Sequence, residues 1–191
     1  SASGRAIDPP AVKRMFRPLL GVFDGLPDQE IILERRVDGA EYAHGTDWAQ
    51  ENDWTVIVTL RTDIYPMRVV AYLKTNKKPY PVMAAMLDAR IRAYGGPACH
   101  DATGVGKAVC DMLQEDAEGV TLGQNKYSIL AEYVRAIEGD EIEAPMIRSM
   151  EREHRLAPAA AIFTNKAHTP DTIMAGALAY LAWQGGNPSI D

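Results

Sequence analysis

The chain has 191 residues and a formal net charge of −6, and hydrophobic residues make up 47% of it. This length and composition suit a globular domain and exclude a fibrous or largely disordered chain. The acidic balance argues against gripping nucleic acid by bulk positive charge, so any such contact is expected to be local. No apolar run is long enough to cross a bilayer, and residues 1–10 lack the layout of a signal peptide, so we expect a cytoplasmic protein without membrane contact.

The N-terminal part of the chain is predicted to lead into a β-rich core. Residues 9–24 have apolar positions at helical spacing until glycines and a proline break the pattern, so we expect a short helix that acts as an arm. Residues 30–37 are expected to form an edge strand, and residues 41–47 the first core strand.

Two further strands are predicted to form a hairpin. Residues 54–60 (WTVIVTL) are dense in β-branched side chains, which is typical of a buried strand. Residues 67–73 (MRVVAYL) have the same character. Asp63 and Pro66 favour a turn between the two segments.

The second half of the chain alternates helices with short strands. Residues 80–94 have amphipathic helical spacing, and residues 98–101 form a short apolar strand before a sharp turn. The remaining expected elements are a helix at 107–114, a helix at 125–138, an extended piece at 142–144, a helix at 145–155 with Pro145 in its first turn, and an apolar helix at 171–183. This order predicts an α/β fold with a mixed sheet and helices on both faces.

Three aspartates lie at boundaries of these predicted elements. Asp47 ends the first core strand, Asp101 ends the strand after the long helix, and Asp171 opens the last helix. Strand ends gather along one edge of a sheet, and a helix packed on that sheet can present its first turn there. Carboxylates brought together in this way favour Mg²⁺ or Mn²⁺, and two such ions about 3.5–4 Å apart can clamp a phosphate. Each aspartate alone is equally consistent with a turn or a helix cap.

Two sequence motifs resemble the nuclease domains of the large terminase subunits of tailed bacteriophages. Residues 42–60 (YAHGTDWAQENDWTVIVTL) resemble the first motif of that family, which places Asp47 on a metal-binding aspartate and Asp53 on a second one. Residues 100–113 (HDATGVGKAVCDML) resemble the second motif, which places Asp101 on another metal ligand. The two motifs occur in the order that the family has.

The resemblance continues to the end of the last helix. Lys126 at the start of a helix, followed by residues 142–145, is similar to a lysine-led helix and short strand of the family. Residues 168–183 (HTPDTIMAGALAYLAW) resemble the closing motif. In one departure, Pro170 precedes Asp171 where many members have a further aspartate.

This resemblance implies a ribonuclease H-like fold and a metal-dependent endonuclease that cleaves double-stranded DNA. It implies that Asp47, Asp101 and Asp171 hold one or two Mg²⁺ or Mn²⁺ ions, with Asp53 as an auxiliary ligand. It further implies a chain that works in the host cytoplasm during DNA packaging, with an ATPase domain, a portal protein and a small terminase subunit as partners.

The first residues, Ser-Ala-Ser-Gly, look like the edge of an excised piece. Residues 1–40 are therefore interpreted as an arm or linker from an N-terminal ATPase domain, and residues 41–191 as the nuclease domain.

Lysines and histidines near these motifs are weaker candidates. Lys107, Lys126 and Lys166 are candidates for contacts with the DNA backbone, although solvated surface lysines are more common. His100 and His168 flank the aspartates, where a histidine can orient a carboxylate or move a proton, and a structural role is equally consistent with the sequence.

Two alternatives stay open at this point. Another ribonuclease H-like enzyme, such as a junction resolvase or a transposase core, would use the same carboxylates on a different substrate. A non-catalytic interaction module would bind metal weakly or not at all, and Pro170 in place of an aspartate favours keeping this alternative in view. Substrate assays separate the first alternative, and metal binding separates the second.

Overall fold

A computed structural model describes residues 4–50, 53–164 and 167–186 of the chain. The strands are β1 (Phe16–Phe23), β2 (Ile31–Ile32), β3 (Tyr42–Asp47), β4 (Thr55–Arg61), β5 (Met67–Thr75), β6 (Ala98–Asp101), β7 (Glu118–Val120) and β8 (Ile142–Ile147). The helices are α1 (Pro9–Met15), α2 (Tyr80–Tyr94), α3 (Val105–Cys110), α4 (Lys126–Glu138), α5 (Arg148–Leu156), α6 (Ala160–Phe163) and α7 (Asp171–Gln184), with a 3-10 turn at Gly123–Asn125.

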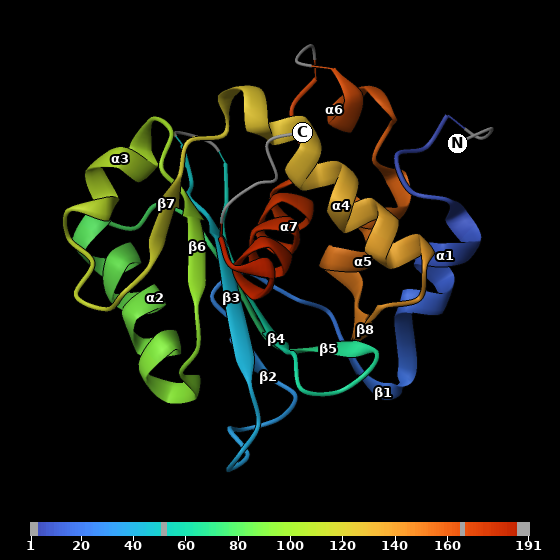
Figure 1. The fold of residues 1–191 in the computed structure, drawn as a ribbon, viewed down its shortest axis with the longest axis horizontal. Coiled ribbons are helices and arrows are strands. Elements are labelled where there is room, and N and C mark those ends of the chain that lie inside the picture. The colour runs from blue at the N-terminus through green and yellow to red at the C-terminus, as the bar shows by residue number, and fades with distance from the viewer. Residues whose placement is uncertain (1–3, 51–52, 165–166, 187–191) are drawn as a thin grey trace.

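The described strands form one mixed sheet in the order β1-β8-β5-β4-β3-β6-β7, and β2 pairs with β5. The strands β3, β4 and β5 are antiparallel neighbours, whereas β6 runs parallel to β3. Helices α2 and α3 cover one face, and α7 lies on the other face with α4 and α5 beyond it (Figure 1). This arrangement confirms the predicted mixed sheet with helices on both faces, including the hairpin of β4 and β5.

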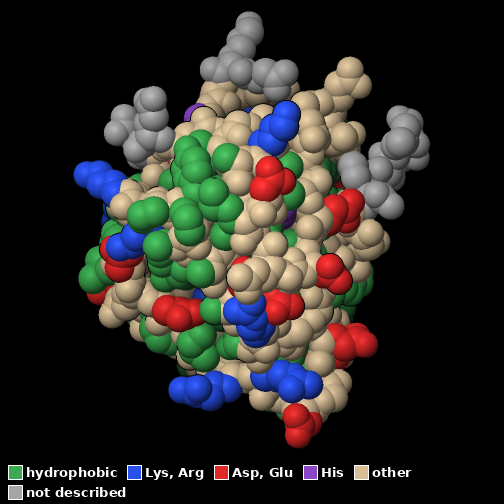
Figure 2. All heavy atoms as spheres, turned by 90° about the vertical axis from the view of Figure 1, so that its left-hand side faces the viewer, with side chains coloured by type: hydrophobic (Ala, Val, Ile, Leu, Met, Phe, Trp, Pro, Cys, Tyr) green, Lys and Arg blue, Asp and Glu red, His purple; other side chains and the backbone are tan. Residues whose placement is uncertain are grey.

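The sheet separates two apolar cores because alternate side chains of a strand point to opposite faces. On the face of α2 and α3, Trp48, Ile57 and Leu87 belong to one cluster of buried side chains. The outer side of these helices is mixed, and apolar side chains gather there among charged ones (Figure 2). Tyr80 and Val82 of α2 are among the exposed apolar residues.

The opposite core is built around α7, whose residues from Asp171 to Ala182 are all buried. Gly45 lets this helix approach β3 unusually closely. A Cβ atom added to Gly45 would overlap the carbonyl oxygen of Ala175 and the amide nitrogen of Ala179. The backbone of α7 therefore packs directly on β3, and its N-terminus lies at the edge where β3 ends.

Four predicted elements were wrong in part. The helix predicted over residues 9–24 ends at Met15, and β1 follows it and pairs in parallel with β8. Pro18 in β1 has no amide proton to donate, which is tolerated in an edge strand. The strand predicted over residues 30–37 is reduced to β2.

The helix predicted over residues 145–155 begins at Arg148 instead, because Pro145 lies within β8 and faces Arg17 of β1. The helix predicted over residues 107–114 also differs, since α3 begins at Val105 and ends at Cys110.

None of the helices in the described ranges is both long enough and apolar enough to span a membrane.

Candidate metal centre

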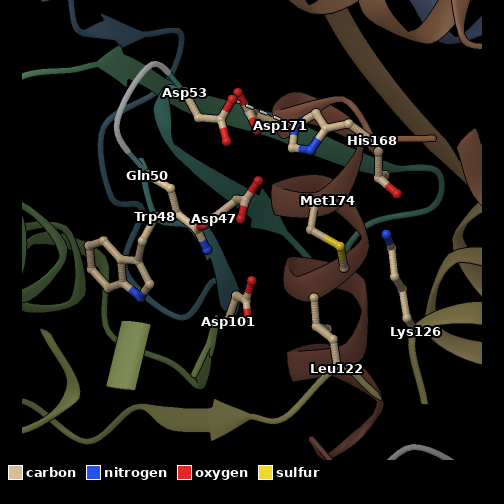
Figure 3. Close-up of a pocket in the computed structure, with 11 residues that line it drawn as sticks. Asp47, Trp48, Gln50, Asp53, Asp101, Leu122, Lys126, His168, Asp171 and Met174 are labelled. Carbon is tan, nitrogen blue, oxygen red and sulfur yellow. Dashed lines mark hydrogen bonds and ion pairs between the residues drawn. The ribbon is translucent and has the colours of Figure 1, made fainter. Parts of the chain in front are cut away.

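One pocket at the edge of the sheet brings the four candidate aspartates together (Figure 3). Asp47 and Asp101 end the parallel neighbours β3 and β6, so both side chains emerge at the same edge. Asp171 is the first residue of α7, and Asp53 lies in the loop before β4. The pocket is lined by Asp47, Trp48, Gln50, Asp53, Asp101, Leu122, Lys126, His168, Thr169, Asp171 and Met174.

Asp47 lies at the centre of this acidic group, and its exposed fraction is only 8%. Burial raises its pKa well above the usual value, and the neighbouring carboxylates of Asp171, Asp101 and Asp53 raise it further. Both effects disfavour the ionised form of Asp47 in the folded chain. A cation in the pocket would favour that form, because it would offset the repulsion between the carboxylates.

Asp171 is held in place by contacts from two sides. The backbone N–H of Trp54 donates to Oδ2 of Asp171 over 3.2 Å. Nε2 of His168 lies 3.3 Å from Oδ1 of Asp171 and 4.0 Å from Oδ1 of Asp53. The His168 ring points toward both carboxylates (Figure 3). These contacts fix one carboxylate and place an imidazole next to it.

Asp101 is oriented by the tight turn that follows β6. The backbone N–H of Thr103 donates to Oδ1 of Asp101 over 2.8 Å. In this turn the backbone of Gly106 lies against the backbone of Asp101, and a Cβ atom added to Gly106 would overlap the carbonyl oxygen of Asp101. A glycine is needed at this position because only a residue without a side chain allows so close an approach.

A buried hydrogen bond connects the two strand ends that carry Asp47 and Asp101. Nε1 of Trp48 donates to Nδ1 of His100 over 3.0 Å. Burial lowers the pKa of His100, so the neutral ring carries its proton on Nε2, which is buried and has no hydrogen-bond partner among the described residues. Trp48 follows Asp47 and His100 precedes Asp101, so this contact holds β3 and β6 together next to both carboxylates.

The lysine candidates have different positions. Lys126, at the start of α4, lines the pocket, and Figure 3 shows its side chain beside Met174. Lys107 is exposed on α3 and does not line the pocket. Lys166 lies outside the described residues.

Glu153 of α5 lies close to the site without lining it. Oε1 of Glu153 accepts a hydrogen bond from the backbone N–H of Thr172 over 3.2 Å. Its carboxylate therefore satisfies an amide group in the first turn of α7, which would otherwise have no partner in the helix.

The donors in the pocket fit a divalent cation. Carboxylate oxygens are the ligands that Mg²⁺ and Mn²⁺ prefer. The pKa of Asp47 is raised by burial and by repulsion from the neighbouring carboxylates, and such an ion would offset that repulsion. Sequence reasoning did not identify Gln50 or Met174 as pocket residues. Both residues lie within the motif stretches 42–60 and 168–183, but their positions at the pocket depend on how a loop and one face of α7 meet at the site.

The chain belongs to the family of terminase RNaseH-like domains. The family model described as the terminase RNaseH-like domain matches residues 44–175, which is more than half of the chain. This match confirms the resemblance drawn from the sequence motifs. A search of curated proteins found no match.

Solved structures with the same fold include three large terminase proteins. The large terminase nuclease from thermophilic phage G20c with bound magnesium has a TM-score of 0.74 at 17% identity, over 94% of this chain and 98% of that chain. The large terminase nuclease domain from bacteriophage SPP1 with bound Mn has a TM-score of 0.54 at 14% identity, over 73% and 85% of the two chains. The large terminase of another thermophilic bacteriophage, in complex with ADP, has a TM-score of 0.59 at 11% identity, over 90% of this chain and 44% of that chain. At these identities the likeness establishes the fold, and the expected ribonuclease H-like sheet is confirmed.

Proposed function

We propose that this chain is a metal-dependent endonuclease that hydrolyses phosphodiester bonds of double-stranded DNA. In this proposal it is the C-terminal nuclease of a viral DNA-packaging terminase. The observation that carries the proposal is the meeting of Asp47, Asp101 and Asp171 in one pocket, although they come from segments far apart in the sequence. Membership of the terminase family supports it, as do the bound magnesium and Mn of two structures with the same fold.

Asp47, Asp101 and Asp171 are the residues that would hold one or two Mg²⁺ or Mn²⁺ ions, with Asp53 as an auxiliary ligand. Such ions supply an activated water and stabilise negative charge on a phosphate. The chain keeps the carboxylates oriented beforehand, because backbone N–H groups of Trp54 and Thr103 bind Asp171 and Asp101. Such orientation lowers the cost of assembling the site.

The same pocket is suited to the DNA backbone. Lys126 lines the pocket together with the carboxylates, so its ammonium group can contact a phosphate next to the ions. Phosphates are alike at every base pair, whereas sequence is read at the base edges. We therefore expect little sequence preference in cleavage.

The proposed setting is a larger packaging machine. Residues 1–40 would connect the nuclease of residues 41–191 to an ATPase domain, while contributing α1, β1 and β2 to the nuclease fold. The match to less than half of the large terminase chain solved with ADP supports this arrangement. The portal protein, the small terminase subunit and double-stranded DNA are the proposed partners, in the host cytoplasm.

Plasmid cleavage tests the proposed activity. The chain is incubated with supercoiled plasmid and Mn²⁺, Mg²⁺ or chelator, and the wild type is compared with Asp101→Asn, whose fold is checked by circular dichroism. We expect chelator to stop cleavage and the substitution to lower the rate by at least about 100-fold, because a ligand is lost. Asp111→Asn is the matched control, since Asp111 is exposed just after α3 and does not line the pocket. Unchanged cleavage by Asp101→Asn would falsify the proposal.

The substrate distinguishes this proposal from other ribonuclease H-like enzymes. Plain duplex, a four-way junction and an RNA–DNA hybrid of equal length are offered in the same buffer. Efficient cleavage of the plain duplex supports the terminase assignment, whereas a strong preference for the junction or the hybrid contradicts it.

A further inference from the structure

Helix α2 has the reverse of the polarity expected for a helix on the surface of a domain. Two of its three charged residues, Asp88 and Arg90, are buried against the rest of the chain. The residues of α2 that are exposed to solvent are mostly apolar, and they are Tyr80, Pro81, Val82, Ala85, Ala89, Arg92 and Ala93. A helix that is apolar on both its inner and its outer side is usually covered on both sides. The outer side of α2 therefore has the character of an interface.

The apolar surface extends from α2 onto the neighbouring helix. Ala108 of α3 and Met112 just after it are exposed, and apolar side chains gather over this side of the molecule (Figure 2). We call the exposed apolar residues of α2 together with Ala108 and Met112 the α2 face. Exposed apolar patches of this kind mark sites where another molecule docks. We propose that the α2 face is the interface of a homodimer, so that its occupant is a second copy of this chain.

The end of the α2 face at the start of the helix is positively charged. Lys77 and Lys78 directly precede α2, and the side chain of Lys77 is exposed. Nζ of Lys78 lies 3.4 Å from Oδ1 of Asp28. The N-terminus of α2 adds the positive end of the helix dipole.

The opposite end of the α2 face is negatively charged. Residues 111–116 run beside the second half of α2, because the backbone N–H groups of Gln114 and Glu115 donate to the carboxylate of Asp88. Nε of Arg92 lies 2.7 Å from Oε1 of Glu115. The carboxylates of residues 111–116 are those of Asp111, Glu115 and Asp116. They outnumber the one guanidinium group beside them.

These charges are complementary to a second copy of the same face. In a two-fold dimer the same surface of both copies meets itself, so each contact occurs twice. If the two α2 helices pack antiparallel, Lys77 of one copy lies near Glu115 of the other, and the helix dipoles oppose one another favourably. A parallel arrangement would instead bring lysine against lysine. The charges therefore favour the antiparallel dimer.

The shape of the α2 face fits the same arrangement. The larger side chains of Tyr80 and Val82 lie in the first turn of α2, whereas Ala89 and Ala93 in its second half are small. An antiparallel pair centred between Ala85 and Ala89 places the large residues of one copy over the small residues of the other. Large side chains packed against small ones fill the space between two helices.

This dimer would keep the two metal centres apart. The helix begins near the metal centre, because it follows Thr75, which pairs with Thr55 beside Trp54 and Asp171. Its last residue, Tyr94, packs on Tyr42 at the far end of β3. Antiparallel copies therefore hold their metal centres at opposite ends of the dimer. We expect the two centres to act independently, so the inference does not depend on the proposed nuclease activity.

Sedimentation velocity of the full chain over a range of concentrations tests the inference. A contact between helices of 15 residues is smaller than a standard interface, so we expect a dissociation constant on the order of 10 µM, measured between about 1 and 300 µM. Ala89→Glu places two like charges at the centre of the interface and should weaken dimerisation at least about tenfold. Ala160→Glu is the matched control, because Ala160 is exposed on α6 and lies outside the α2 face.

A charge exchange tests the antiparallel orientation. Lys77→Glu and Glu115→Lys each bring like charges together twice in their own dimers, so each variant alone should dimerise at least about twofold more weakly than the wild type. An equimolar mixture of the two variants restores both opposite-charge contacts in a mixed dimer. We expect the mixture to dimerise more tightly than either variant alone.

Each outcome has one meaning for the inference. A wild type that stays monomeric up to about 300 µM overturns it, since even a weak interface would be occupied there. Dimerisation that survives Ala89→Glu places the interface elsewhere and also overturns it. A mixture of Lys77→Glu and Glu115→Lys that gains nothing overturns the antiparallel orientation. Plasmid cleavage by Ala89→Glu should match that of the wild type within a factor of about two, because the substitution lies far from the metal centre. A large loss of cleavage would contradict the independence of the two centres.

Discussion

Asp47 has a carboxylate in surroundings that disfavour its charge. The side chain is buried, and burial together with Asp171, Asp101 and Asp53 raises its pKa. Repulsion of this kind lowers stability when no cation is present, and residues that serve function often have such a cost. The sequence placed Asp47 at the end of a strand, but the repulsion became visible only once the tertiary contacts were known.

Asp47→Asn should separate stability from metal binding. We expect the variant to be more stable than the wild type without divalent ions, by about 1 kcal/mol, because a like charge is removed. Mn²⁺ at 100 times its dissociation constant should stabilise the wild type by about 2.7 kcal/mol and the variant far less. Thermal unfolding with and without Mn²⁺ measures both effects. A variant that gains as much from Mn²⁺ as the wild type would show that Asp47 does not bind the ion.

Trp48→Phe tests the hydrogen bond that joins the ends of β3 and β6. The substitution keeps an aromatic ring but removes the N–H that donates to His100, which leaves Nδ1 of His100 buried and unpaired. We expect a loss of about 1–3 kcal/mol in the free energy of unfolding, measured by denaturant titration. Trp183→Phe is the control, because Trp183 is 45% exposed. Equal losses in the two variants would contradict the role given to this hydrogen bond.

The contact between β3 and α7 determines where the last carboxylate lies. Gly45 belongs to β3 and allows α7 to pack directly on its backbone. Because Asp47 is two residues beyond Gly45 and Asp171 opens α7, this packing sets the spacing of two candidate ligands. In the first motif, Gly45 is therefore needed for the packing of α7, and Asp47, two residues later, is the candidate metal ligand.

Gly45→Ala should force α7 away from the sheet. The added methyl group has no space, and overpacking of this kind costs about 1–3 kcal/mol or more. We expect a lower melting temperature and weaker Mn²⁺ binding, since Asp171 moves with α7. Gly139→Ala is the matched control, because Gly139 has negative φ and its new Cβ would lie 3.2 Å from the carbonyl oxygen of Arg135, which is a tight contact but no overlap like the one at Gly45. Normal Mn²⁺ affinity in Gly45→Ala would show that the spacing is set elsewhere.

The elements that sequence reasoning missed depend on long-range pairing. The apolar spacing of residues 9–24 is helical only over its first part, and β1 forms because β8 provides a parallel partner more than 120 residues away. Pro145 looks like the first residue of a helix, yet β1 and β5 pair with β8 on either side and hold it in the sheet. The strands β3, β4 and β5 were predicted well because their β-branched residues and turns act locally.

The whole molecule should lose stability in acid through its buried histidines. Burial lowers the pKa of both His44 and His154 to about 4, below the ordinary value of 6.5. Unfolded histidines take up a proton below pH 6.5, whereas the folded ones resist it, so the unfolded state binds more protons and stability falls as the pH drops from 6.5 to 4. The raised pKa values of Asp47 and Glu153 oppose this trend.

His154→Gln isolates one histidine from these opposing effects. His154 is fully buried between Tyr133 and the carbonyl of Met150, and glutamine can contact both. Between pH 6.5 and 4, we expect the free energy of unfolding of the variant to fall by about 1 kcal/mol less per pH unit than that of the wild type. The reason is that the unfolded variant has no histidine at position 154 to take up a proton. Denaturant titrations at several pH values measure the difference. If stability depended on pH in the same way in both proteins, this would contradict the lowered pKa of His154.

The polypeptide between Asp47 and Asp171 includes most of the fold, and α7 is the last helix described. Any chain interrupted between residues 101 and 171, whether still on a ribosome or clipped by a protease, has Asp47 and Asp101 but lacks the third carboxylate. Under the proposed function, all three carboxylates hold the metal ions, so such fragments cannot cut DNA. The host genome and the replicating viral genome would thus be exposed to this nuclease only after its synthesis has passed α7 and the helix has docked on β3.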